Sequence, residues 1–140
     1  MRKWICYIAC IIQWTIIPAC SSLQFSNDYT LVLTDWRLVS VRINPEDSFE
    51  TPRTRTSFLR IERDRHYNGN AYCNSFGGKI TVSGRNISFE SGMSTMRGCP
   101  QAEKYESLVG SALHSVDNYS IVGRTLYLKQ GNIILMIYTA

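Results

Sequence analysis

The stretch "NYSIVGRTLYLKQGNIILMIYT", residues 118–139, decides the fold of this chain. Three runs rich in β-branched and aromatic residues are separated by the dipeptides Gly123-Arg124 and Gly131-Asn132. A two-residue turn with glycine at its first position is typical of a type II′ β-hairpin. The same pattern surrounds Gly84-Arg85 in "KITVSGRNISFE", residues 79–90. The sequence therefore predicts an antiparallel meander.

Two earlier segments also have the composition of strands. "LVLTDWRLVSVRI", residues 31–43, is rich in Val, Leu and Ile, and "SFLRIER", residues 57–63, alternates apolar and charged side chains. The residues expected to face the core in these segments are Trp36, Leu38, Val41, Leu59 and Ile61. Residues 44–56 between them contain two prolines and many polar residues, so we expect a loop there.

"NGNAYCNSFGGK", residues 68–79, combines turn-forming residues with a cysteine. We expect Gly69 to end a strand or begin a tight turn with a positive φ. Residues 71–76 could resume as a strand, and "NSFGG", residues 74–78, is predicted to make a second reversal with Phe76 turned toward the core.

One segment has helical periodicity instead. Within residues 99–116, apolar residues recur at the spacing of one helix face: Ala102, Tyr105, Val109, Ala112, Leu113 and Val116. Pro100 suits a first turn, and the acids Glu103 and Glu106 complement the helix dipole near the N-terminus. We therefore predict a mainly β (α+β) fold. It has about eight antiparallel strands in a curled sheet or lipocalin-like half-barrel, with one packed amphipathic helix.

The N-terminus resembles a bacterial lipoprotein signal. Residues 1–19 have a basic start followed by the apolar run Trp4–Ile17, too short to span a bilayer, and "IPAC" at 17–20 resembles a lipobox. This predicts a signal peptide over 1–19, lipidation of Cys20 and a flexible tether over 20–30, ahead of a domain over 31–140. An ordinary signal cleaved after Ala19 and an uncleaved anchor are the alternatives. Ser21 after the cysteine resembles outer-membrane sorting, facing the periplasm of a two-membrane organism.

Charge and cysteine content narrow the possible functions. The 121 residues after position 19 contain 13 basic and 11 acidic residues, which gives no electrostatic case for nucleic-acid binding. In an exported chain lipidated at Cys20, the remaining cysteines are Cys73 and Cys99. A disulfide between them is the leading interpretation, and two buried free thiols or a redox-active pair are the alternatives.

Few residues of the sequence are candidates for metal binding, cofactor binding or partner contact. His66 and His114 are the only histidines and neither has nearby ligand partners in the sequence, so no zinc site or cofactor is predicted. Asn74, Thr95 and Glu103 form a possible binding patch around the two cysteines. The alternative is structural: Asn74 binding turn amides, Thr95 fixing the loop before the helix, and Glu103 capping the helix.

Five elements occur in a fixed order along the chain: "WRL" (36–38), "GNAYCNSFGG" (69–78), "STMRGC" (94–99), the acids Glu103 with Glu106, and "LYL" (126–128). Together they resemble the META domain family, which includes the HslJ-like heat-shock lipoproteins, and the resemblance covers 31–139. It implies a compact β-rich domain with one helix, in an exported or lipoprotein setting linked to stress tolerance, envelope integrity or secretion. It implies no enzyme activity.

The leading functional hypothesis is thus a non-enzymatic, lipid-anchored envelope protein that contacts another envelope protein. The alternatives are a binder of hydrophobic small ligands in a lipocalin-like cavity and, third, a thiol-active protein.

Overall fold

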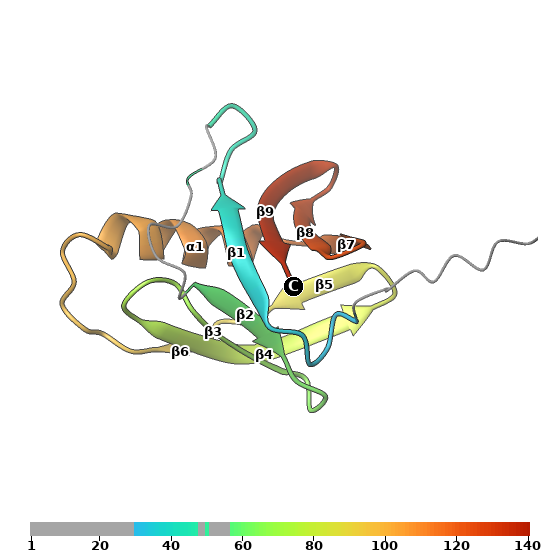
Figure 1. Ribbon diagram of the computed structural model, residues 1–140, viewed down its shortest axis with the longest axis horizontal. Helices are drawn as coiled ribbons and strands as arrows, with labels where there is room; N and C mark the ends of the chain where they lie inside the picture. Colours follow the sequence, from blue (N-terminus) through green and yellow to red (C-terminus); the bar gives the residue numbers. More distant parts are fainter. Residues whose placement is uncertain (1–29, 48–49, 51–56) are drawn as a thin grey trace, which may run out of the picture.

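The computed structural model describes residues 30–47, 50 and 57–140. These residues form nine strands and one helix (Figure 1). The elements, in chain order, are β1 (Trp36–Val41), β2 (Phe58–Ile61), β3 (His66–Asn70), β4 (Ser75–Ser83), β5 (Asn86–Phe89), β6 (Met93–Ser94), α1 (Glu103–Ser115), β7 (Asn118–Val122), β8 (Thr125–Gln130) and β9 (Ile133–Thr139). The predicted signal peptide, Cys20 and all of the tether except Thr30 lie outside the described residues.

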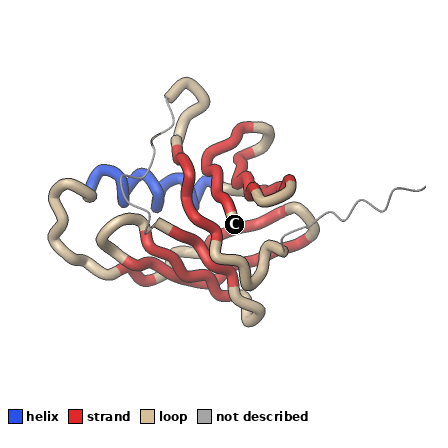
Figure 2. Tube along the Cα trace, viewed as in Figure 1, coloured by secondary structure: helices blue, strands red, loops and turns tan. Residues whose placement is uncertain are grey.

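The strands form one curled antiparallel sheet, which confirms the predicted fold class. Its order is β3-β2-β1-β9-β8-β7-β5-β4-β6, and β3 also pairs with β4, so the pairings return on themselves (Figure 2). The link between β5 and β7 is short, with a single partner pair, Asn86 and Asn118. The sheet is therefore ring-like, and it is not a regular barrel.

The three predicted hairpin turns are confirmed. Gly84, Gly123 and Gly131 have φ values of +59°, +57° and +56°. None of the residues that follow them is among the positive-φ positions of the described chain. A positive φ at the first central position alone is the signature of the type II′ turn. These turns fix the registers of β4–β5, β7–β8 and β8–β9.

The interior of the ring is filled by apolar side chains. Trp36, Leu59, Leu126 and Leu128 have no exposed surface, and all of the core-facing residues predicted in the first two segments are buried. The helix packs against both β1 and β5, which are well separated in the strand order. Its predicted apolar face is confirmed, since all of that face is buried except Tyr105, which is partly buried. No helix among the described residues is long and apolar enough to cross a membrane.

The start of the first strand and the backbone conformation of Gly69 differ from the prediction. The first strand begins at Trp36 and not at residue 31, because the chain bends at 31–33 and Leu33 has a φ of +64°. β3 ends at Asn70, so the expectation that residues 68–70 end a strand is confirmed, whereas Gly69 has no positive φ and the alternative of a tight turn at this glycine is wrong. Glycine is needed there for a different reason. A Cβ at this position would overlap the Phe58 carbonyl oxygen and the Phe76 ring.

The reversal comes earlier than predicted. The chain turns at 71–74, where the Ala71 N–H donates to the Asn74 carbonyl at 3.1 Å, and residues 74–78 do not reverse because β4 runs unbroken from Ser75 to Ser83. Phe76 is partly buried against the core. Pro100 lies in the turn that precedes α1, so it is not in the first helical turn.

Candidate functional site

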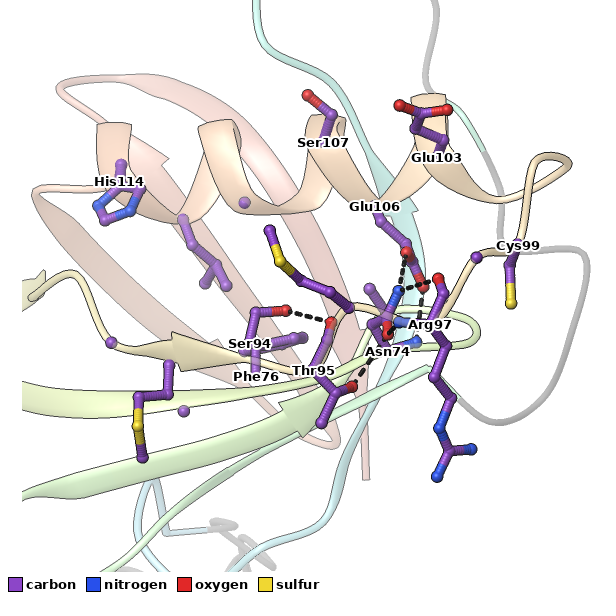
Figure 3. A pocket seen from close by; sticks show the side chains of 18 of the residues that line it. Asn74, Phe76, Ser94, Thr95, Arg97, Cys99, Glu103, Glu106, Ser107 and His114 are labelled. Carbon is purple, nitrogen blue, oxygen red and sulfur yellow. Dashed lines mark hydrogen bonds between the residues drawn. The ribbon is translucent and has the colours of Figure 1, made fainter.

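Asn74 is the centre of a hydrogen-bond network that joins three segments of the chain (Figure 3). The residue is 9% exposed, and all of the hydrogen-bonding capacity of its side chain is used. The Nδ2 group donates to Glu106 Oε2 at 2.7 Å and to the Arg97 carbonyl at 3.2 Å. The Oδ1 atom accepts from the Arg97 N–H at 2.7 Å and from Thr95 Oγ1 at 3.0 Å. A buried amide satisfied in this way fixes the positions of its partners.

Glu106 ties the helix to the 71–74 turn. Besides the contact with Asn74 Nδ2, its Oε1 atom accepts from the backbone N–H of Cys73 at 2.8 Å and of Asn74 at 2.7 Å. Burial by itself raises the pKa of this carboxyl, but the hydrogen bonds from the Asn74 side chain and the two amides outweigh that effect. The pKa of Glu106 is therefore lowered, and the group is ionised at neutral pH.

Residues 92–99, which include β6, form a wall opposite α1; we call them the β6 wall. Thr95 binds this wall to β4, because its N–H donates to the Ser75 carbonyl at 2.9 Å and its Oγ1 accepts from the Ser75 N–H at 3.1 Å. Gly92 packs so closely on Gly77 that a Cβ at position 92 would overlap the Gly77 backbone. The wall is thus fixed along its β4 side.

Cys73 and Cys99 attach the far end of the β6 wall to the same turn. Their sulfur atoms lie at disulfide-bonding distance, and their Cα atoms are 6.5 Å apart, within the usual range for a disulfide. The pair spans 26 positions of sequence. The helix, the turn and the β6 wall are therefore held together by the Asn74 network, and the two sulfur atoms lie where a disulfide would add a covalent link.

A groove of about 610 Å³ lies between α1 and the β6 wall; we call it the α1–β6 groove. Its lining includes Tyr67, Ala71, Phe76 and Leu113. The β6 wall adds Met93 and Met96, which are 88% and 97% exposed and are the most exposed large apolar side chains of the described residues. At the N-terminal end of the helix the lining is polar, with Asn74, Glu103 and Glu106.

The structure brings together two of the three residues of the predicted patch. Asn74 and Thr95 are hydrogen-bonded to each other. Glu103 lines the groove but is exposed and takes no part in the Asn74 network, and the helix N-cap, Ala102, makes no side-chain cap bond. Glu106, one turn further on, is the acid that enters the network. Sequence analysis placed both acids in the first helical turn, but the choice between them depends on how the helix is rotated against the turn at 71–74.

The two histidines lie apart. His66, at the start of β3, has its Nδ1 atom 3.2 Å from Asp64 Oδ2, whereas His114 lines the C-terminal end of the α1–β6 groove. Within residues 30–47, 50 and 57–140, no three His, Cys, Asp or Glu side chains cluster as a metal site would require.

Comparisons with known proteins agree with this fold. The META domain family model matches residues 29–139. An NMR structure of a protein from Burkholderia xenovorans has a TM-score of 0.65 at 18% identity, over 78% of this chain and 82% of that one. Another NMR structure has a TM-score of 0.50 at 15% identity, over 75% of this chain and 87% of that one. At these identities both support the fold alone, and no curated protein matches the chain. The family match spans most of the sequence, so the chain belongs to the META domain family.

Proposed function

We propose that this protein is a non-enzymatic, lipid-anchored envelope protein that contacts another envelope protein through the α1–β6 groove. The observation that carries the proposal is the exposure of Met93 and Met96 beside an apolar groove. Large apolar side chains that stand together at a hollow are uncommon on a monomer's surface unless something covers them.

Methionine suits such a contact. Its unbranched, polarisable side chain adapts to irregular partner surfaces and packs well against aromatic rings. In the groove the two methionines flank an apolar lining that includes Phe76 and Leu113. We therefore expect the partner to present an apolar or aromatic surface, with polar groups at the Glu103 end.

The polar groups of the groove favour binding over catalysis. A general base requires a pKa near the working pH and an oxygen free to take a proton. Glu106 has a lowered pKa, and both of its oxygens accept hydrogen bonds from the protein itself. The Asn74 amide is equally occupied. These groups have the contacts expected of structural supports that hold the β6 wall in place.

The packing of the ring favours a protein partner over a hydrophobic ligand held inside it. The side chains that fill the interior include Trp36, Leu128 and Met136, all without exposed surface. An apolar ligand there would have to displace core side chains. Contact at the surface groove needs no such rearrangement.

The groove contact is tested by substitution in the full-length protein. Met93→Asp/Met96→Asp puts two charges at the proposed contact, and Val39→Asp, at a residue 43% exposed on β1, is the control. Each variant is cross-linked chemically in intact cells, and the envelope proteins recovered with it are quantified by mass spectrometry. We expect the double variant alone to lose specific partners by about tenfold, as hot-spot losses of more than 1 kcal/mol would give. Equal recovery from all three proteins would contradict the groove contact.

The anchor is tested separately. The mass of protein extracted from membranes should correspond to a chain that begins at an acylated Cys20, and Cys20→Ala should abolish labelling by radioactive palmitate. A mature chain without a lipid would contradict the anchor while leaving the groove contact open to the first test.

A further inference from the structure

One end of the domain carries exposed arginines and exposed apolar side chains together. It consists of the bend at 31–33, the β2–β3 loop and the tips of the β4–β5 and β7–β8 hairpins. Its exposed residues are Leu33, Arg63, Arg65, Val82, Arg85 and Val122. We call this surface the tether end, because Thr30, the first described residue, lies in it.

Contacts place these segments beside one another. Thr30, Leu33, Arg63, Arg65 and Val82 line one shallow hollow of about 450 Å³. The β4–β5 tip is joined to the start of β7 where the Tyr119 N–H donates to the Arg85 carbonyl at 2.9 Å, and β7 continues from there beyond the first residue of β5 to the β7–β8 tip. Figure 1 shows both tips on the same side of the long axis as the segment that precedes β1, with the loop between β6 and α1 at the other end.

The charge of the tether end is cationic. Arg63, Arg65 and Arg85 belong to none of the ion pairs among the described residues. The acids nearby offset part of this charge. Asp35 and Glu62 both pair with Arg60, at 2.7 and 2.8 Å, and Asp64 lies 3.2 Å from His66, which is charged only when protonated. Arg60, Arg63, Arg65 and Arg85 outnumber these three acids, so the tether end keeps a small net positive charge carried by its exposed arginines.

Exposed apolar side chains occur in the same segments as these arginines. Leu33, Val82 and Val122 are 40%, 42% and 66% exposed. Cationic and apolar side chains that share one surface match the interface of an anionic bilayer, where the charges meet headgroups and the apolar groups enter the headgroup–acyl boundary.

The length of the tether between Cys20 and the domain supports the same contact with the membrane. Thr30 follows Cys20 by ten positions, which at full extension reach about 35 Å. A domain on so short a tether stays close to the bilayer, so even weak contacts are formed for much of the time.

We propose that the tether end rests on the anionic phospholipid surface of the membrane that holds the protein, with the 95–102 end of the α1–β6 groove directed away from it. This inference rests on the anchor of the proposed function. It adds an orientation, in which the lipid contact and the partner contact use opposite ends of the domain.

The test places a photoreactive phenylalanine analogue at Val82, Val122 or Met96 of the full-length protein in cells and measures cross-linking to phospholipid. We expect lipid adducts at 82 and 122 in at least about fivefold excess over 96. Fivefold is the change in membrane binding that corresponds to one arginine at the membrane surface. Arg63→Glu/Arg65→Glu removes two such contributions and should lower the yield at 82 by about 30-fold. The matched charge control, Arg97→Glu/Lys104→Glu at the other end, should leave it unchanged.

Equal lipid adducts at all three positions, no adducts, or equal effects of the two charge variants would overturn the proposed orientation. Palmitate labelling of the same samples reports on the anchor by itself. Lipid adducts that favour 82 and 122, without palmitate labelling, would refute the anchor and support the lipid-binding surface. Palmitate labelling with equal lipid adducts at all three positions would support the anchor and refute the lipid-binding surface.

Discussion

Asn74→Asp replaces one donor group of the network with a carboxylate oxygen of nearly the same shape. In the native protein Asn74 Nδ2 lies 2.7 Å from Glu106 Oε2, so the variant would bring two carboxylates to hydrogen-bonding distance. Two unit charges at that separation repel by about 6 kcal/mol at an effective dielectric constant of about 20. Taking up a proton is less costly, at about 4 kcal/mol at pH 7 for a carboxyl with an ordinary pKa near 4. We therefore expect the pair to share a proton.

The cost of taking up a proton, the smaller of the two, determines how much stability the variant loses. Asn74→Asp should lower the free energy of unfolding by about 3–4 kcal/mol at pH 7, and the lost donor to the Arg97 carbonyl adds about 1 kcal/mol. The shared proton gives the pair a raised pKa in the folded state, so the folded variant binds more protons than the unfolded chain at these pH values. Its stability must then increase as the pH falls from 7 to 5, by up to about 2.7 kcal/mol.

The assay is urea unfolding followed by the fluorescence of Trp36, which is fully buried and is the only tryptophan after residue 19. The difference in stability between variant and wild type is measured at pH 5, 6 and 7. Asn132→Asp, at an exposed hairpin position, is the control for the same chemical change. A loss of stability that does not depend on pH in this range, or one no larger than that of the control, would refute the role given to Asn74 and Glu106.

Three further outcomes are expected from the same unfolding assay. Gly69→Ala should destabilise the domain by about 1–3 kcal/mol because the added methyl group has no space, whereas Gly98→Ala, with nothing near it, should be close to neutral; equal effects would contradict the close approach. Cys73→Ala/Cys99→Ala should cost about 3.5 kcal/mol, the loop-closure value for 26 residues, and added reductant should then have no further effect on stability. Glu106 contributes stability that is present above its ordinary pKa of 4.5 and is lost as the pH falls through its lowered folded pKa. Glu106→Gln should therefore be less stable than wild type at pH 7 and should lack that acid-induced loss. Parallel pH profiles of stability for the two proteins would contradict this role of Glu106.

The parts of the fold that depend on local chemistry could be predicted from the sequence. The Gly-X turns at 84, 123 and 131 specify a hairpin through a backbone angle that glycine adopts without strain, and the structure has all three. The helix followed from apolar spacing alone, because burial of one face is encoded at 3.6-residue intervals. These features need no knowledge of the rest of the chain.

The features that were missed depend on tertiary contacts. Gly69 reads as a turn residue, but its place inside β3 is set by the Phe76 ring and the Phe58 carbonyl, which reach it from neighbouring strands. Likewise, the position at the helix start points to Glu103 as the acid of the patch or the helix cap, whereas the structure has Glu106 in the network and no side-chain cap bond. The rotation of α1 against the 71–74 turn makes Glu106 the one that accepts from Cys73 and Asn74. The network could be anticipated at Asn74 and Thr95, but its acid could not.

The central claim, that the α1–β6 groove contacts a protein, is tested most directly by position-specific photo-cross-linking in living cells. A photoreactive residue is placed at Met96, which is 97% exposed in the groove, or at Val39, which is exposed on β1 away from it. The proposed function predicts a discrete adduct with one envelope protein from position 96 and none from position 39. The same set of weak adducts from both positions, or none from position 96, would contradict it.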